Sequence, residues 1–303
     1  MTAFSILFPI IFVVFSGYAC IKLNIFSASA LDGLRQFIFN LAIPVFLFIN
    51  MYQADLTQAL SGSVMLSFYL PVFAVYLISC GALKLLMNKS LADSAAMALA
   101  STYSNTILVG LPVIISSLGA EYGAMVFMII TFHSALLFSC TFIFASNFQS
   151  RFIDTIKPLL LNPIVMSISL GLVCNYLSMP ISDTIQTALT LLSEPAIAGA
   201  LFVLGASLNS YSIKQAWQSA LFISLTKLVL LPLTVFVMAK WAMQLPPKHV
   251  AVLTLMSASP LGVNAYLVAR QLKCQQAVLA SSVVLSTVLS IFTLAAWLTA
   301  LVT

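Results

Sequence analysis

Long apolar segments, separated by short polar stretches, occupy nearly the whole chain. A helix that crosses the hydrocarbon layer of a membrane, roughly 30 Å thick, needs about 20 mostly apolar residues, and several segments here reach that length. Membrane β-barrels show short strands with alternating apolar and polar residues, a pattern that this chain lacks. We therefore expect an all-α integral membrane protein with ten transmembrane helices, at residues 3–22, 31–52, 63–87, 94–118, 123–145, 158–177, 183–208, 217–241, 249–271 and 276–301.

The composition points the same way. Apolar residues make up 62% of the chain and charged residues 6%, whereas soluble domains carry about 25% charged residues. The longest expected connection, residues 146–157, is too short to fold by itself. A lipid bilayer is therefore the expected surrounding, and no soluble domain is expected.

The positions of the basic residues predict the orientation. Lysines and arginines are enriched in cytoplasmic loops. With the N-terminus outside, nine of them lie on the cytoplasmic side, whereas only Lys240 and Lys248 lie on the outer side. The nine are Lys22, Arg35, Lys84, Lys89, Arg151, Lys157, Lys214, Arg270 and Lys273. Because the first of them follows the first apolar segment, we expect an uncleaved first helix and both termini outside.

Two halves, residues 1–150 and 151–303, each contain five of the expected helices. Five is an odd number, so the halves would insert with opposite orientations, as in the inverted repeats of many secondary transporters. Similar residues recur at similar depths in the two halves: Pro9 and Pro163, Pro44 and Pro195, Pro71 and Pro232, and Asn105 and Asn264. The sequence therefore predicts two inverted five-helix repeats.

The fourth and ninth expected helices contain residues that break a helix. The candidate site residues in the fourth are Ser104, Asn105, Thr106, Gly110 and Pro112, and in the ninth they are Ser259, Pro260, Gly262 and Asn264. Proline removes an amide donor and clashes with the carbonyl four residues earlier, and unsatisfied backbone in hydrocarbon is tolerated only inside protein or beside a wet cavity. We expect two interrupted helices that cross at a substrate site and turn their positive N-terminal ends toward an anion. Simple kinks for close helix packing are the alternative.

Two ionisable residues, Lys227 and Glu194, lie near the middle of the eighth and seventh expected helices. Charges at this depth are costly and usually face a bundle interior or a cavity. One interpretation is an ion pair that fixes helix packing. The other gives Lys227 the role of attracting an anion, with Glu194 as its counter-charge. His133, in the fifth helix, fits a hydrogen-bonded packing residue or a proton relay.

Motifs of other protein classes are absent from the sequence. There is no zinc-protease, serine-hydrolase or P-loop motif, and neither CxxC nor Cys/His spacing typical of a zinc site. We therefore expect no catalytic residues, no metal and no cofactor. The basic residues form no run, so a nucleic-acid partner is not expected either.

Several short segments, in order along the chain, resemble the auxin efflux carrier family, in its bacterial branch of organic-acid permeases. They are Phe39 to Pro44 with Leu47-Phe48, Asn105 to Pro112, Asn162-Pro163, Leu204 to Leu208, and Lys227-Leu228 followed by Pro232. The charged Glu194 before Pro195 departs from the uncharged residue expected there.

The resemblance implies two inverted five-helix repeats, as in bile-acid symporters, that build a scaffold domain and a transport domain. Asn105, Pro112 and Pro260 match the crossing residues. It also implies a homodimer in the bacterial inner membrane, with periplasmic termini, that exports or exchanges carboxylates such as malonate, malate or auxin-like acids.

The leading hypothesis is therefore a secondary transporter of small organic anions, working by alternating access and in the direction of efflux. A sodium-coupled symporter of the bile-acid type is the alternative. A receptor would carry a soluble signalling region and a channel would show a filter sequence or rings of charge, and the sequence has neither.

Overall fold

The computed structural model describes residues 3–53, 61–145, 163–209 and 217–302. Helices form the regular structure of this part of the chain, apart from one isolated β-bridge, because a helix satisfies its backbone hydrogen bonds internally. The expected 146–157 connection, the start of the sixth expected helix and Asn162 lie outside the described residues.

Seven helical stretches are long and apolar enough to cross a membrane: Phe4–Lys22, Ser29–Tyr52, Gly62–Leu86, Ala120–Ala145, Asp183–Leu208, Trp217–Ala242 and Gln276–Leu301. They match seven of the ten expected helices. In the first half they comprise α1 (Ala3–Lys22), α2 (Ala28–Phe37), η1 (Ile38–Ala42), α3 (Ile43–Tyr52), α5 (Gly62–Leu86), η3 (Ala120–Tyr122) and α8 (Gly123–Ala145). In the second half they comprise α11 (Asp183–Ser193), α12 (Pro195–Leu208), α13 (Trp217–Leu225), η4 (Thr226–Leu230), α14 (Leu231–Val237), η5 (Met238–Ala242) and α17 (Gln276–Leu301).

The other three expected helices are shorter or interrupted. The sixth is described as α10 (Pro163–Tyr176). The fourth divides into α6 (Leu91–Thr102) and the pair η2 (Thr106–Gly110) and α7 (Leu111–Leu118). The ninth divides into α15 (Pro247–Ala258) and α16 (Val263–Gln271). Both predicted interruptions are therefore present.

Prolines explain where three of the helices widen. The π-helical turns η1, η2 and η4 are each followed directly by a helix with proline in its first turn, at Pro44, Pro112 and Pro232. A proline ring clashes with the carbonyl four residues earlier, and a π turn is one way to make room for it. The prolines seen in the sequence thus set the local helix geometry.

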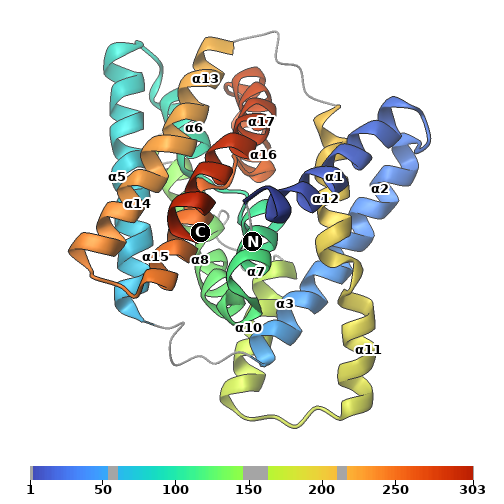
Figure 1. Cartoon of the computed structure of the whole chain (residues 1–303). Helices are drawn as coiled ribbons and strands as arrows, with labels where there is room; N and C mark the ends of the chain where they lie inside the picture. The colour runs from blue at the N-terminus through green and yellow to red at the C-terminus, as the bar shows by residue number, and fades with distance from the viewer. Residues whose placement is uncertain (1–2, 54–60, 146–162, 210–216, 303) are drawn as a thin grey trace.

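The helices form two groups (Figure 1). In the group that we name the scaffold group, α1 packs on α12, and α3 packs on α10 and α11. The crossing group contains α5, α6, α7, α8, α13, α14, α15, α16 and α17, with α5 on α6, α13 on α17 and α14 on α15. The groups meet where α1 contacts α7 and α17, and where α3 and α10 contact α8.

Glycines allow the scaffold helices to approach closely. A Cβ atom added at Gly205 would lie 1.7 Å from the carbonyl oxygen of Val14, and one added at Gly17 would lie 2.0 Å from that of Phe202. In the other scaffold pair, a Cβ atom at Gly171 would lie 2.6 Å from the carbonyl oxygen of Phe48. Small residues at such positions allow the backbones of membrane helices to come into contact.

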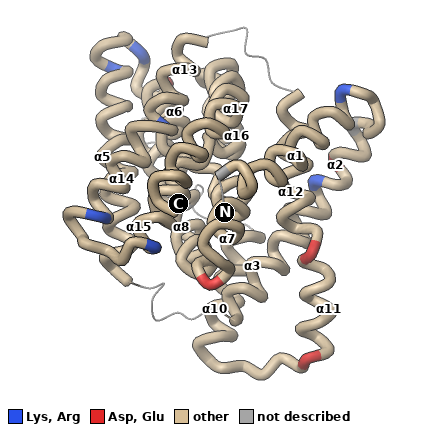
Figure 2. The backbone as a smooth tube through the Cα atoms, in the orientation of Figure 1, with Lys and Arg blue, Asp and Glu red and all other residues tan. Residues whose placement is uncertain are grey.

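The surface of the protein suits lipid. Along α1, the side chains of Phe4, Phe8, Phe12 and Phe15 are all more than half exposed. Figure 2 shows the charged residues mostly near the ends of the helices, with few along their middles. Inside the bundle, many buried hydroxyls bond to their own helices, as Thr141 does to the carbonyl of Leu137 at 2.8 Å. An exposed apolar face and hydroxyls that bond within their own helix are expected of helices in a bilayer.

Candidate functional site

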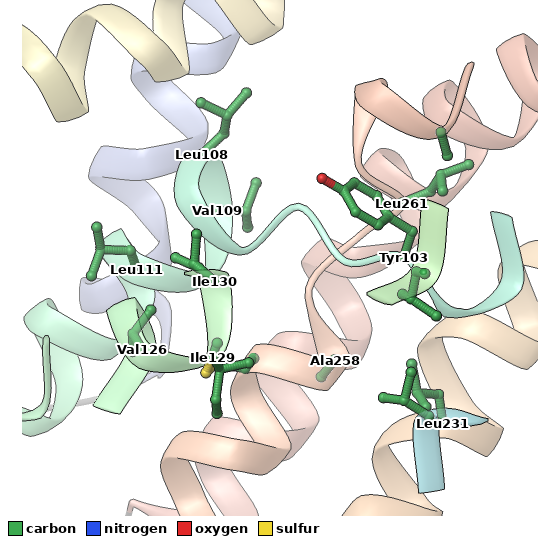
Figure 3. Close-up of a cluster of buried hydrophobic side chains, with 14 of the residues drawn as sticks. Tyr103, Leu108, Val109, Leu111, Val126, Ile129, Ile130, Leu231, Ala258 and Leu261 are labelled. Carbon is green, nitrogen blue, oxygen red and sulfur yellow. The ribbon is translucent and has the colours of Figure 1, made fainter. Parts of the chain in front are cut away.

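The two helix interruptions meet in the middle of the crossing group. Ser104 and Leu261 form an antiparallel β-bridge, in which the amide of Asn105 donates to the carbonyl of Pro260 at 2.8 Å and the amide of Gly262 donates to the carbonyl of Tyr103 at 3.0 Å. Figure 3 shows Tyr103 and Leu261 at these neighbouring extended segments. The broken helices therefore cross and are joined through their backbones.

This hydrogen-bond register changes one expected correspondence. The bridge is symmetric about Ser104 and Leu261, so Asn105 takes the place that Gly262 takes in the second half. Asn264 lies two residues further along, in the first turn of α16, and its side chain is exposed whereas that of Asn105 is buried. The two carboxamides thus belong to the two different broken helices of the crossing without being equivalent.

A side chain from a neighbouring helix supports each half of the crossing. His133 in α8 accepts the amide of Ser104 at its Nε2 atom, at 3.2 Å. Ser286 in α17 accepts the amide of Leu261 at 3.1 Å. The His133 ring also stacks on Tyr103, with 5.0 Å between ring centroids. His133 thus makes the hydrogen bond and the packing contact that one of its two expected roles requires, and with Nε2 as acceptor its proton lies on Nδ1.

Polar side chains also form hydrogen bonds with the hydroxyl of Tyr103. The hydroxyl of Tyr103 lies 2.8 Å from that of Ser134, and the amide nitrogen of Asn264 lies 3.4 Å from the Tyr103 oxygen. Sequence reasoning missed Tyr103 and Ser286, because neither breaks a helix or carries a charge. The position of Tyr103 directly before Ser104 was the available signal.

Glycines make room where the crossing is tightest. A Cβ atom at Gly262 would lie 2.6 Å from the Tyr103 ring, and one at Gly110 would lie 2.8 Å from the Ser259 hydroxyl. Such distances require a neighbour to move. Thr106 and Gly110 lie in η2, and Pro112 lies in the first turn of α7. Both elements pack on α15, the helix that ends directly before Ser259 and Pro260.

Replacing Gly262 by alanine is expected to displace the Tyr103 ring, and with it the stack on His133. We expect a loss of transport of about tenfold or more, with folded protein retained, because only side chains need to move far. Flux into proteoliposomes and thermal unfolding in detergent measure the two effects. Gly62→Ala is the matched control, since its Cβ atom would meet nothing within 4 Å; equal flux in both variants would contradict the tight fit at Gly262.

Lys227 belongs to the crossing as well. Its side chain is fully buried, and its Nζ atom donates to the carbonyls of Ser257 and Ser259, at 2.5 and 2.7 Å. Lys227 lies in the π turn η4, directly before α14 and its Pro232. The ammonium group therefore caps the C-terminal end of α15, where partial negative charge accumulates.

Glu194 does not pair with Lys227. It lies between α11 and α12 with an exposed side chain, and it lines a shallow hollow on α11 with Asp183, Gln186, Thr187, Thr190 and Leu191. The ion pair considered from the sequence is therefore wrong. Depth along a helix is visible in a sequence, but the direction in which a side chain points depends on how the helices pack.

The crossing is suited to an anion. Two helices begin there, η2 after Asn105 and α16 after Gly262, and helix N-termini carry partial positive charge and free amide donors. The Nδ2 atom of Asn105 and the hydroxyl of Ser104 are buried without a hydrogen-bond partner among the described residues. No aspartate or glutamate with a described side chain is buried. The site thus offers unused polar groups next to positive charge.

Comparison with known proteins places the chain in a family. A family model described as "Membrane transport protein" matches residues 2–152 and again residues 148–298. The chain belongs to this family. The resemblance to the auxin efflux carrier family is thereby confirmed, and the molecule is a multi-pass membrane protein of a transport family.

A curated relative covers almost the whole chain. It is a protein of Rhizobium meliloti (strain 1021) with the name "Putative malonate transporter", 21% identical over 296 residues, which are 95% of this chain and 92% of the relative. The similarity spans both halves, so it is not limited to one motif.

Proposed function

We propose that this member of the family is a secondary transporter that moves small organic anions out of the cell by alternating access, with the helix crossing as its substrate site. The observation that carries the proposal is the crossing itself: two helix N-termini, the Asn105 carboxamide and the buried Lys227 meet where no described carboxylate is buried. The predicted site residues Ser104, Asn105, Thr106, Gly110, Pro112, Ser259, Pro260, Gly262 and Asn264 keep this role as a prediction.

Carboxylates are the proposed substrate class. A carboxylate can accept hydrogen bonds from helix N-termini and from an amide side chain, and the relative in Rhizobium meliloti carries malonate in its name. Malonate and malate are therefore the first dicarboxylates to test, and an auxin-like acid is the first monocarboxylate.

The proposed architecture is ten transmembrane helices in two inverted repeats, residues 1–150 and 151–303. Corresponding contacts support it, since α1 packs on α12 as α10 packs on α3, and α5 packs on α6 as α14 packs on α15. The symmetric backbone bonds of the crossing and the two successive family matches, which divide the chain near residue 150, are further support.

The proposed movement is a displacement of the crossing group relative to the scaffold group. Tyr103, Ser104 and Asn105 are all less than a tenth exposed, so a substrate needs a change of structure to reach them. In the scaffold group, close backbone contacts at Gly17, Gly171 and Gly205 favour a rigid body.

The proposed setting is the bacterial inner membrane, with both termini on the periplasmic side and a homodimer as the assembly. Lys84 and Lys89 at one end of α5, against Lys240 and Lys248 at the far ends of η5 and α15, fit the orientation that the sequence predicts. Figure 2 shows basic residues at the upper end of α5 and, at the opposite end, beside α14 and α15.

A flux screen in proteoliposomes tests the function. We expect uptake of at least one of malonate, malate and indole-3-acetate, driven by an opposite gradient of the same anion. Malonamide, a neutral molecule of the same shape as malonic acid, is expected to be excluded. Separate pH and sodium gradients establish the coupling. Absence of carboxylate flux, or equal flux of malonamide, would refute an anion carrier.

A further inference from the structure

The buried end of α15 needs hydrogen-bond donors, and positive charge is favourable there. The last carbonyls of a helix have no partners within it and carry partial negative charge. Here the helix ends at Ala258 in the interior of the crossing group, with Ser257 and Ser259 fully buried. These carbonyls are therefore closed off from bulk water. They accept hydrogen bonds from the ammonium group of Lys227 instead.

The same oxygen atoms are chemically suited to a small cation. In transporters with interrupted helices, unwound carbonyls and half-helix C-termini can coordinate sodium. Two hydroxyls on the same two stretches of helix, those of Ser224, three residues before Lys227, and of Thr254, three residues before Ser257, are buried without a hydrogen-bond partner among the described residues. Residues three apart share one face of a helix.

We infer that the ammonium group of Lys227 occupies the position of a bound monovalent cation at the C-terminal end of α15, so that the chain carries its own cation and transports its anion without sodium. Lys227 acts as a positioning residue, because it holds Ser259 and thereby Pro260, whose carbonyl binds the amide of Asn105. The part concerning transport rests on the proposed function, whereas the part concerning the cation site does not.

Lys227→Ala removes the ammonium group and leaves space for a cation. We expect the flux of this variant to fall about tenfold or more and to recover partly with ammonium, methylammonium or propylammonium. The flux of the wild-type protein is expected to be the same in sodium and in choline. The thermal unfolding temperature of Lys227→Ala is expected to rise with the concentration of ammonium, because a ligand that binds only the folded state stabilises it. Wild-type unfolding should not respond.

Two control variants separate a cation site from a packing effect. Lys227→Met fills most of the same volume without a charge, so it should lose flux and gain nothing from ammonium. Lys240→Ala removes a lysine that lies over the rings of Phe236 and Trp241, away from the crossing, and should resemble wild type.

The outcomes are distinct. A wild-type protein that requires sodium, or a Lys227→Ala variant whose unfolding temperature and flux ignore every ammonium ion, overturns the inference, as does full flux in Lys227→Met. If wild-type protein moves no organic anion but ammonium still stabilises Lys227→Ala and not Lys227→Met, the proposed function fails and the cation site stands.

Discussion

Replacing Gly205 by leucine is expected to force α1 away from α12 and to leave little folded protein. Even the Cβ atom of the new side chain would lie 1.7 Å from the carbonyl oxygen of Val14. That neighbour is helix backbone, which cannot turn aside as a side chain can. Overpacking commonly costs about 1–3 kcal/mol, and we expect the upper end or more here, out of a total stability of about 5–15 kcal/mol. Size-exclusion profiles and thermal unfolding in detergent measure the loss.

Gly81→Ala is the matched control, because Gly81 also lies within a long helix, α5, but a Cβ atom there would meet nothing within 4 Å. Alanine is favoured over glycine in a helix by about 1 kcal/mol, so this variant should be as stable as wild type or slightly more stable. A Gly205→Leu protein that unfolds at the wild-type temperature would show that α1 and α12 are not in backbone contact.

Features that depend on short stretches of sequence were predictable. The apolar segments correctly predicted seven continuous helices, and the Pro, Gly and Asn residues of the fourth and ninth segments correctly marked the interruptions after Thr102 and Ala258. Both signals act locally, since hydrocarbon demands about 20 apolar residues for each crossing and proline disturbs the turn before it.

Features that depend on partners distant in sequence were not predictable. The backbone carbonyls bound by Lys227 are present in every residue, so no pattern marks Ser257 and Ser259 as its acceptors. The register of the crossing likewise follows from how two helices meet. The matching carboxamides in the sequence paired Asn105 with Asn264, whereas in the structure Gly262 is the residue equivalent to Asn105. The exposed position of Glu194 depends on the packing of α11 against α3.

Asn105→Ala is expected to abolish most anion transport without lowering stability. The Nδ2 atom of Asn105 is buried and has no hydrogen-bond partner among the described residues, so its removal breaks no bond of that atom in the folded chain. A hydrogen bond to a charged group is worth about 1.5–3 kcal/mol, and losing one should weaken carboxylate binding about 10- to 150-fold. Flux below saturation and the unfolding temperature of the same preparation give the two readouts.

Three further variants decide whether Asn105 binds substrate or holds the fold. Asn105→Asp keeps the size but replaces the amide donor by a negative charge, so it should bind an anion more weakly still. Asn264→Ala is also expected to lose transport, because it removes a carboxamide from the first turn of α16. Asn50→Ala alters a carboxamide of the scaffold group that bonds to the carbonyl of Phe46 in its own helix, and it should transport as wild type does. Wild-type flux in Asn105→Ala and Asn264→Ala would exclude the crossing as the substrate site, whereas lost flux with an equally lowered unfolding temperature would make Asn105 a structural residue.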